Sequence, residues 1–314
     1  MVDLSIELPK GFLEEEPKTL IVPRWRKEVW AVTLDLLVEF DRVCRKNGIR
    51  YFCDGGTLLG AIRHKGFVPW DDDIDVVMCR GEYARLDAIA PNEFKYPYFW
   101  QTNTTDPGSA RGHAQLRNSK TTAILKSEMR DGKAIYSFNQ GIFIDVFPFD
   151  NVPDDADERL RFRERLTRIQ ARAYRIKSAR IAAMYSSGCI FSPRGLYRRT
   201  RTMAINMSEK MFRQDYLSQA MRELEQSAQE FNGRKTAEVA PVSFNPFHRE
   251  TLPSHFFDEA IEVEFEFLKI PVMAHYREAL AINYGNWQEH VIGASAHGGL
   301  FVDTNRPYTE YLAR

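Results

Sequence analysis

Aspartates that alternate with apolar residues constrain this chain more than any other feature. In the run DDDIDVVM, which starts at Asp71, a single apolar residue separates Asp73 from Asp75, and three apolar residues follow. Side chains alternate along a β-strand, so a strand from Asp73 to Met78 places both carboxylates on one face and the intervening apolar side chains in a core. The pattern therefore predicts a sheet that holds two carboxylates close together on a rigid strand.

A third carboxylate lies inside another apolar segment. Asp145 follows Ile144 in the run GIFIDVFPF, and a charge in such surroundings is costly to bury without a partner. If the two strands are neighbours, Asp73, Asp75 and Asp145 form a triad of carboxylate oxygens, the ligands that Mg²⁺ prefers. We therefore expect these three residues to be catalytic and to bind Mg²⁺, with Mn²⁺ as a metal that suits the same ligands.

Two further aspartates, Asp71 and Asp72, extend the acidic run. Like charges about 4 Å apart repel by roughly 1 kcal/mol even in water, and a divalent cation would offset that repulsion. The same run also fits a solvated surface turn. The sequence therefore leaves open whether either residue joins the metal site.

A glycine pair precedes the aspartates. Gly55, Gly56 and Thr57 lie between a predicted strand, Ile49–Cys53, and a predicted helix, Thr57–His64. Glycine lets the backbone approach a phosphate, and the first turn of a helix offers unpaired N–H groups to it. These three residues are candidates for binding a substrate phosphate, although a Gly-Gly-Thr run also occurs in ordinary tight turns.

Three basic residues, Arg63, His64 and Lys65, stand at the end of the same predicted helix. Cations at this position interact favourably with the helix dipole. They are equally suited to contact a phosphate or another part of a donor molecule. We therefore count them among the candidate substrate-binding residues.

The periodicity of the remaining chain predicts helices and strands together. Segments with helical periodicity are 23–46, 82–90, 158–184, 202–231 and 275–284. Segments typical of strands include 96–101, 113–116 and 142–147. This predicts an α+β (α/β) fold in which a mixed sheet core has flanking helices and a mainly helical basic insertion. We expect three parts: a catalytic core over 1–155, a basic helical region over 156–235, and a C-terminal portion over 236–314 that packs back on the core.

Charge is spread unevenly along the chain. The 314 residues carry 43 basic and 43 acidic side chains, but residues 159–213 hold 15 basic and 2 acidic ones, a net of +13. This stretch fits a helix with a solvated arginine face. It also fits a surface for a phosphate-bearing glycan or for peripheral contact between Arg159–Arg213 and an anionic membrane. Nucleic acid is not expected as a partner, because the aromatic residues of the stretch follow no stacking pattern.

The cysteines and the hydropathy indicate a compartment. The four cysteines are far apart and lack metal-binding spacing, which favours a reducing environment. No apolar run approaches the roughly 18 to 20 residues needed to cross a bilayer, and residues 1–18 do not resemble a signal peptide. We expect a cytoplasmic protein, and the basic stretch leaves open whether it is peripheral at the inner face of the membrane.

Two long motifs carry a resemblance to a known family. The run GGTLLGAIRHKGFVPWDDDID begins at Gly55, and GIFIDVFPFDNVP begins at Gly141. The run QLRNSKTT from Gln115 and the run YGNW from Tyr284 are similar to further motifs of that family. On these residues the chain resembles the LicD family, which includes the fukutin-related domains.

The resemblance implies a nucleotidyltransferase-like fold and an activity. The activity is the metal-dependent transfer of a phospho-substituent, phosphocholine-like or a polyol phosphate, from a CDP-linked donor. The implied acceptor is a hydroxyl of a cell-surface glycan or a lipid-linked sugar, as in lipopolysaccharide biosynthesis, and the implied product is CMP.

The resemblance also assigns roles to residues. The paired aspartates of the family match Asp73 and Asp75, although the spacer of 16 residues between Gly56 and Asp73 is longer than in the general nucleotidyltransferase pattern. In this hypothesis Asp145 completes the metal site and helps to deprotonate the acceptor. Arg63 or Arg117 would offset negative charge that develops during transfer, so Arg117 joins the candidate substrate-binding residues.

Two other functions fit the same residues. One is a nucleotidyltransferase that moves NMP from NTP to a small molecule, and the other is a non-catalytic protein that binds a glycan or a membrane. No motif identifies the transferred group. Tyr96, Tyr98, Phe99 and Trp100 can form an aromatic box for a quaternary ammonium, but their pattern is more typical of a strand core.

Overall fold

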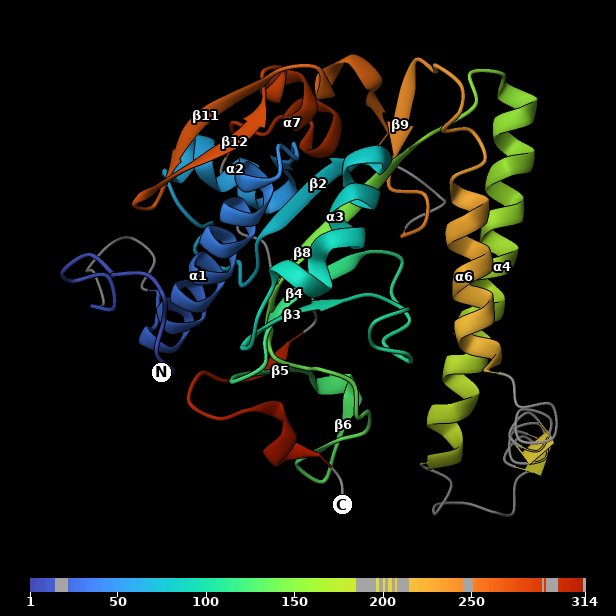
Figure 1. Ribbon diagram of the computed structural model, residues 1–314, viewed down its shortest axis with the longest axis horizontal. Helices are drawn as coiled ribbons and strands as arrows, with labels where there is room; N and C mark the ends of the chain where they lie inside the picture. Colours follow the sequence, from blue (N-terminus) through green and yellow to red (C-terminus); the bar gives the residue numbers. More distant parts are fainter. Residues whose placement is uncertain are drawn as a thin grey trace.

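Two segments that lie far apart in the sequence form a parallel pair of strands at the centre of the fold, seen in a computed structural model (Figure 1). The pair consists of β2 (Asp75–Cys79) and β8 (Ile142–Asn151). Strand β8 is buried along most of its length, which accounts for its nearly continuous apolar sequence. The structure describes residues 1–14, 22–184, 196–197, 200, 203–204, 207, 215–244, 251–289, 291 and 299–312.

The sheet extends on both sides of this pair through antiparallel neighbours. The strand order is β1–β2–β8–β4–β3, with β1 at Phe52–Cys53, β4 at Ala114–Asn118 and β3 at Tyr98–Gln101. The far end of β8 also pairs with β9 (Glu238–Ala240), which pairs in turn with β10 (Leu252–Pro253). The predicted α+β fold with a mixed sheet is therefore confirmed.

Within the described residues, four helices lie around the sheet. Helix α1 (Arg24–Lys46) contacts β8 and β4, and α3 (Arg80–Glu93) contacts β2, β8 and β3. Helix α2 (Gly55–His64) connects β1 to the loop before β2, and α7 (Tyr276–Tyr284) packs against it. Because the apolar residues of α1 recur at helical spacing, one long face of the helix is buried in the core.

A C-terminal hairpin closes over the loop that leads to the aspartates. It consists of β11 (Ala260–Phe265) and β12 (Leu268–Met273), and Glu266 lies in its turn. The Glu266 N–H donates to the Lys65 carbonyl at 2.7 Å, and its carboxylate accepts from the Phe67 N–H at 3.1 Å. Gly66 lies against the same carboxylate, where a Cβ atom would clash. The turn therefore fixes the backbone between α2 and β2.

Shorter elements complete the described chain. Strand β5 (Thr122–Leu125) pairs with β13 (Leu300–Asp303), and β6 (Met129–Arg130) pairs with β7 (Lys133–Ala134). Three 3₁₀ turns lie at η1 (Lys126–Glu128), η2 (Ser254–Phe257) and η3 (Tyr308–Tyr311).

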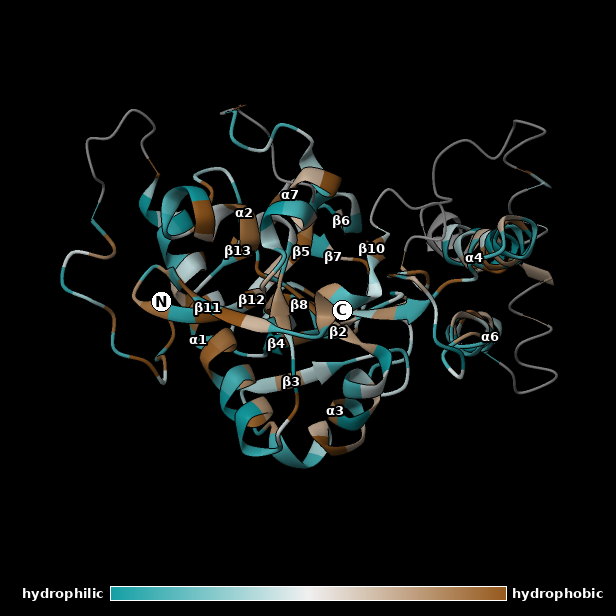
Figure 2. Cartoon of the chain, turned by 90° about the horizontal axis from the view of Figure 1, so that it is seen from above, coloured by the Kyte–Doolittle hydropathy of each residue, from teal (hydrophilic) through white to brown (hydrophobic). Residues whose placement is uncertain are grey.

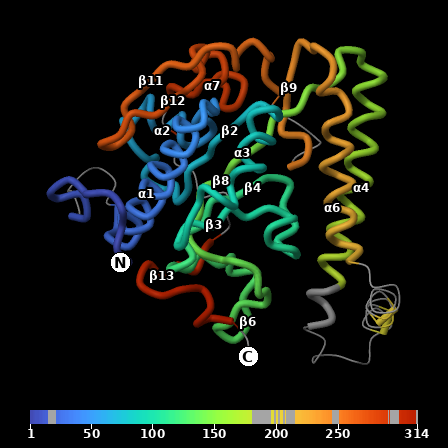
Figure 3. The backbone as a smooth tube through the Cα atoms, in the orientation of Figure 1, coloured from blue at the N-terminus to red at the C-terminus, as the bar shows by residue number. Residues whose placement is uncertain are grey.

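Two antiparallel helices stand beside the sheet as a separate layer (Figures 1 and 2). They are α4 (Ala156–Met184) and α6 (Tyr216–Ala228), which we call the helical hairpin. Figure 3 shows the chain entering α4 directly after β8 and leaving α6 toward β9. The hairpin has an apolar core of its own, which includes Phe162, Leu166, Ile169, Leu217, Met221 and Leu224.

Several predicted boundaries differ from the structure. The strand predicted from Asp73 begins at Asp75, and the helix predicted over 202–231 begins at Tyr216. Asp215 caps α6, because its side chain accepts from the N–H groups of Leu217 and Ser218. Much of 202–214 lies outside the described residues, and the predicted division at 155 and 235 stays a prediction. Within the described part of the chain, no helix is both long and apolar enough to cross a membrane.

Candidate active site

Pairing of two parallel strands brings Asp75 and Asp145 together. Asp75, the first residue of β2, stands opposite Asp145 of β8 in the strand register. The Asp145 N–H donates to the Ile74 carbonyl at 2.9 Å, which locks that register. The prediction that the two aspartate-bearing strands are neighbours is therefore confirmed.

Asp73 joins these carboxylates from the loop before β2. Its position outside the strand corrects the prediction that alternation along one strand would align it with Asp75. The carboxylates still meet, because one oxygen from each of Asp73, Asp75 and Asp145 lies within 4.8 Å of the others. Burial, followed by repulsion from Asp75, Asp71 and Asp145, raises the pKa of Asp73 well above its usual range.

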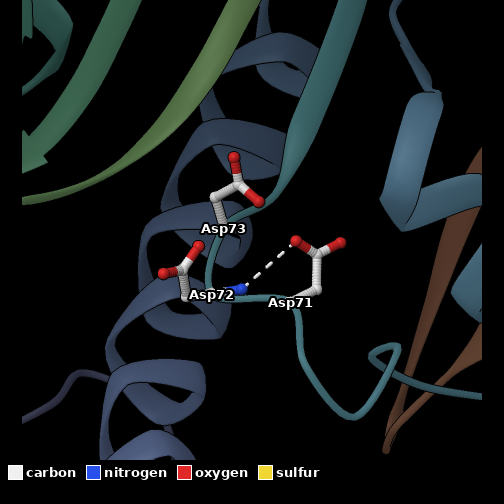
Figure 4. Close-up of side chains that lie close together, drawn as sticks. All are labelled: Asp71, Asp72 and Asp73. Carbon is white, nitrogen blue, oxygen red and sulfur yellow. Dashed lines mark hydrogen bonds between the residues drawn. The ribbon is translucent and has the colours of Figure 1, made fainter. Parts of the chain in front are cut away.

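The upstream aspartates form a second group around Asp73. Asp71, Asp72 and Asp73 also bring one carboxylate oxygen each within 4.8 Å of one another. Figure 4 shows the Asp72 N–H donating to the Asp71 carboxylate, at 3.2 Å. The Trp30 indole N–H holds this loop through the Asp71 carbonyl, at 2.9 Å. Asp71 and Asp72 are therefore close enough to share a cation with Asp73.

The glycine turn is built directly against the carboxylates. Gly55 has φ +57°, and a Cβ atom on it would lie 2.7 Å from an oxygen of Asp75. A Cβ atom on Gly56 would clash with the Asp71 carboxylate. The Thr57 hydroxyl accepts from the Asp75 N–H at 2.9 Å. Only glycine therefore allows the first turn of α2 to approach the acidic cluster this closely.

The basic candidates lie elsewhere. Arg63 and His64 form the last turn of α2 and Lys65 is its left-handed cap, at the end opposite to the glycine turn. A helix of ten residues is about 15 Å long, so its two ends are well separated. The structure thus does not bring these three residues to the carboxylates. Two buried guanidinium nitrogens of Arg63, Nε and Nη2, lack a hydrogen-bond partner among the described residues.

Arg117 is buried inside the sheet, so it has no surface for a substrate phosphate. Its side chain on β4 is 1 % exposed, and burial lowers its pKa to about 9. Its guanidinium donates to the Gln101 side chain at 2.6 Å and to the Gly141 carbonyl at 2.5 Å. It also donates to the Gln115 side-chain oxygen, which links it to the acidic cluster. The position of Arg117 is that of a support behind the site.

Two residues that the sequence analysis missed hold Asp145. Gln115 of β4 stands opposite Asp145 in the antiparallel register, and its amide donates to Asp145 Oδ1 at 2.6 Å. His113 Nε2 lies 3.0 Å from the same oxygen. The signal was the alternation of His113, Gln115 and Arg117, which sends three polar side chains to one face of a buried strand.

The cluster has the chemistry of a metal site. Three carboxylates crowd together in a largely buried place, where their mutual repulsion is strong and a divalent cation would cancel it. Hydrogen bonds from Gln115 and His113 orient Asp145 in the manner of outer-shell partners of metal ligands. The residues therefore fit a bound metal ion.

The aromatic run on β3 lies at the opposite edge of the sheet order from β1 and β2. Trp100 is buried and donates to Asp87 at 2.7 Å, and the Tyr98 hydroxyl donates to Asp35 at 2.9 Å. Tyr96 precedes the strand and is exposed. These contacts support the alternative that the run belongs to a strand core, and they form no aromatic box among the described side chains.

Known proteins match this chain around the same motifs. Residues 48–175 match the family described as LicD/FKTN/FKRP, nucleotidyltransferase domain. The lipopolysaccharide cholinephosphotransferase LicD of Haemophilus influenzae is 27% identical over 266 residues, which cover 84% of this chain and 91% of that protein. The ribitol 5-phosphate transferase FKRP of Homo sapiens is 55% identical over 29 residues, or 9% of this chain and 6% of that protein.

The matched region contains every carboxylate of the acidic cluster and the two residues that hold Asp145. It also contains the glycine turn and the first helix of the hairpin up to Arg175. Residues 48–175 therefore belong to the LicD/FKTN/FKRP nucleotidyltransferase domain family, which confirms the family and the enzyme class that the sequence motifs predicted.

Proposed function

We propose that the protein transfers a phospho-substituent, phosphocholine or a polyol phosphate, from a CDP-linked donor to a hydroxyl of a glycan or lipid-linked sugar. The observation that carries the proposal is the convergence of three carboxylates from the β2 and β8 region on the N-terminal turn of α2. The names of two relatives, a cholinephosphotransferase acting in lipopolysaccharide and a ribitol 5-phosphate transferase, support this class of transferred group.

The carboxylates and the first turn of α2 have different roles in the proposal. Asp73, Asp75 and Asp145 would hold Mg²⁺ or Mn²⁺, which supplies charge neutralisation at the donor diphosphate. The N–H groups in the first turn of α2 orient a phosphate. Gly55 and Gly56 let this turn lie directly against the carboxylates of Asp75 and Asp71. Positioning and electrostatics then account for most of the rate enhancement.

Asp145 faces the acceptor in this scheme. It accepts the proton of the attacking hydroxyl, while Gln115 and His113 keep its carboxylate in place. A bond forms between the acceptor oxygen and the phosphorus of the transferred group, the P–O bond to the bridging oxygen breaks, and CMP leaves. Arg63, His64 and Lys65 lie at the far end of α2. Any contact that they make with the donor would therefore involve parts of the donor away from its diphosphate. Arg117 acts by positioning Gln115.

The test measures CMP release with CDP-choline, CDP-ethanolamine, CDP-ribitol and CDP-glycerol in the presence of Mg²⁺. We expect CMP from at least one donor, and Asp75→Asn should lower turnover at least about 10³-fold, because it removes several kcal/mol of transition-state charge stabilisation. Asp131→Asn is the matched control. Asp131 lies in an exposed turn with φ +50°, a backbone conformation that asparagine tolerates. It has no role in the assigned site.

The outcomes separate the rival functions. Substantial turnover by Asp75→Asn would refute the assigned site. Release of pyrophosphate from CTP, with no CMP from any CDP-linked donor, would favour nucleotidyl transfer instead. If calorimetric titration detects no Mg²⁺ binding and no donor is used, the protein is a non-catalytic binding protein.

We also propose that the helical hairpin contacts an anionic membrane from the cytoplasmic side. Arg161, Arg168 and Arg175 are exposed on α4 and recur every seven residues, so they share one face of the helix. None of the three forms an ion pair with a carboxylate within the described part of the chain. Three cations on one face that pair with no described carboxylate suit anionic headgroups.

A further inference from the structure

A cavity of about 120 Å³ lies between the segment before β4 and the helical hairpin, and it is partly open to solvent. One wall is the segment before β4, with Arg111 and His113. The opposite wall comes from α4 and α6. Phe244, which follows β9 in the sequence, also lines the cavity. None of the residues assigned to metal or donor binding lines this cavity, but His113 connects it to Asp145.

His113 lines the cavity and carries a buried polar atom that no described residue satisfies. His113 is 8 % exposed, and its Nδ1 is buried without a hydrogen-bond partner in the described residues. Its other nitrogen, Nε2, lies 3.0 Å from Asp145 Oδ1. An ionised carboxylate only accepts hydrogen bonds, so Nε2 carries the proton and Nδ1 carries a lone pair. A ligand group that donates a hydrogen bond, such as a hydroxyl, would satisfy this nitrogen.

Arg111 offers a positive charge that the described residues leave uncompensated. Its backbone N–H is fixed by Asn103 at 3.2 Å, while its guanidinium forms no ion pair within the described ranges and its Nε is buried without a partner. Lys177 on the opposite wall differs, because it pairs with Glu128 at 3.2 Å. The guanidinium of Arg111 therefore suits an anionic ligand group in the cavity, such as a phosphate or a carboxylate.

The remaining lining suits the C–H face of a sugar ring. Leu217, Met221 and Leu224 of α6 form an apolar wall. Phe244 is 39 % exposed, and its ring packs edge-on against His113 with centroids 5.0 Å apart. Apolar surface with a few fixed polar groups is the usual make-up of a small-molecule site.

The cavity approaches Asp145 from the side opposite to the glycine turn. In the strand order β1–β2–β8–β4, the glycine turn follows β1, whereas His113 directly precedes β4. A donor phosphate at the start of α2 and a ligand in the cavity would therefore meet at Asp145 from opposite directions.

We propose that this cavity is the acceptor subsite and that the acceptor is a saccharide bearing an anionic group. That the bound saccharide is the acceptor rests on the proposed function. His113 binds a hydroxyl of the saccharide, Arg111 binds its phosphate or carboxylate, and the apolar wall with Phe244 contacts its ring.

The experiment is calorimetric titration of the full-length protein with glucose 6-phosphate, glucuronate and glucose. We expect at least one of the two anionic sugars to bind at least tenfold more tightly than glucose. Arg111→Gln should remove this preference, and Arg111→Lys should retain part of it because the charge is kept. Arg42→Gln is the control, since Arg42 forms an exposed ion pair with Glu39 on α1, and it should bind like the wild type.

The results decide between the inference and the function on which it rests. If neither anionic sugar binds the wild type, or if Arg111→Gln binds them unchanged, the cavity is not a site for anionic saccharides and the inference is wrong. If the anionic sugars bind through Arg111 while no CDP-linked donor yields CMP, the proposed function fails and the saccharide site stands. Thermal unfolding of each variant separates lost binding from lost folding.

Discussion

The acidic cluster and the helical hairpin handle charge in opposite ways. In the cluster, Asp73, Asp75 and Asp145 bring like charges within 4.8 Å of one another. In the hairpin, basic residues of α4 pair singly with acidic residues that follow later in the chain. These pairs are Arg159 with Glu238, Arg165 with Glu230 and Arg172 with Glu223.

The difference teaches that local net charge in a sequence is a poor guide to charge in the fold. The +13 stretch is partly neutralised by acidic residues between Glu223 and Glu238, which come from a different part of the chain. The acidic cluster keeps like charges close together, and either protonation of Asp73 or a bound cation would offset their repulsion. Charged side chains that pair within the protein stabilise the fold. Charged side chains that crowd together or stay unpaired indicate a site that binds a ligand of opposite charge.

A buried ion pair near the end of β8 links the sheet to the helical hairpin and should show the largest effect on stability. Arg80 donates to Asp150 with two bonds of 2.7 Å, and its remaining nitrogen reaches Glu225 of α6 at 2.9 Å. We expect Asp150→Ala to lower the free energy of unfolding by about 3–5 kcal/mol, because it leaves a buried guanidinium without its main partner. Urea denaturation measures this change.

Glu225→Ala is the matched control for that prediction. The Glu225 side chain is 38 % exposed, so its loss should cost far less than the loss of Asp150, whose side chain is fully buried. Equal losses for the two variants would contradict the distinction between buried and surface pairing.

The unpaired arginines should show the next largest effect, on membrane binding. Replacing Arg161, Arg168 and Arg175 together by glutamine should weaken binding to phosphatidylglycerol vesicles about 10²-fold, since each arginine near an anionic surface contributes about 1 kcal/mol. Sedimentation with vesicles measures the change. The control replaces three exposed arginines outside the hairpin, Arg24, Arg42 and Arg85. Equal binding by both triple variants and the wild type would refute a membrane surface on α4.

The raised pKa of Asp73 predicts a pH-dependent effect of Mg²⁺ on stability. Without metal, the folded protein resists ionisation of Asp73, so it loses stability as pH rises from the ordinary aspartate value through the raised pKa. Mg²⁺ binds the ionised cluster, so its stabilising effect should grow over the same interval. Each tenfold gain in affinity adds about 1.4 kcal/mol. Thermal unfolding with Mg²⁺ and with EDTA across this pH range tests the prediction.

Asp73→Asn sharpens the same prediction. The neutral side chain should make the metal-free protein more stable above the ordinary aspartate pKa and should flatten the pH dependence. A stabilising effect of Mg²⁺ that is the same at every pH in the wild type would show that the cluster does not bind it through Asp73.

Paired surface charges should show the smallest effect. Arg172 pairs with Glu223 across the helical hairpin, and both side chains are about half exposed. Arg172→Gln should change the free energy of unfolding by at most about 1 kcal/mol, as for other exposed ion pairs. A double-mutant cycle with Glu223→Gln isolates the pair by urea denaturation. A coupling energy as large as that of a buried pair would remove the contrast between the two regions.

Much of the candidate site could be predicted from the sequence because its residues sit in runs with a clear pattern. Asp75 and Asp145 each lie in an apolar strand, and the prediction that they meet required only that the two strands pair. Asp73 reached the same place by a different route, since a loop rather than strand alternation brings it there. Its contact with the cluster was predicted, but the reason was wrong.

Contacts between residues far apart in the chain could not be predicted from the sequence. His113 and Gln115 hold Asp145 only because β4 lies antiparallel beside β8, and no local pattern states that register. The partners of Arg159 and Arg172 come from segments more than 50 residues later, which no pattern of local charge reveals. Arg117 was predicted to face a substrate because a motif contains it, whereas the sheet buries it.

The turn at Glu266 has a consequence for the order in which the protein matures. Its two hydrogen bonds hold Lys65 and Phe67, nearly two hundred residues earlier in the chain, and so brace the loop that carries the aspartates. A growing chain on the ribosome reaches this turn only after the strands of the central sheet and both helices of the helical hairpin have been synthesised. The acidic loop therefore gains this brace only after residue 266 has been synthesised, and a nascent chain released before Glu266 would lack it.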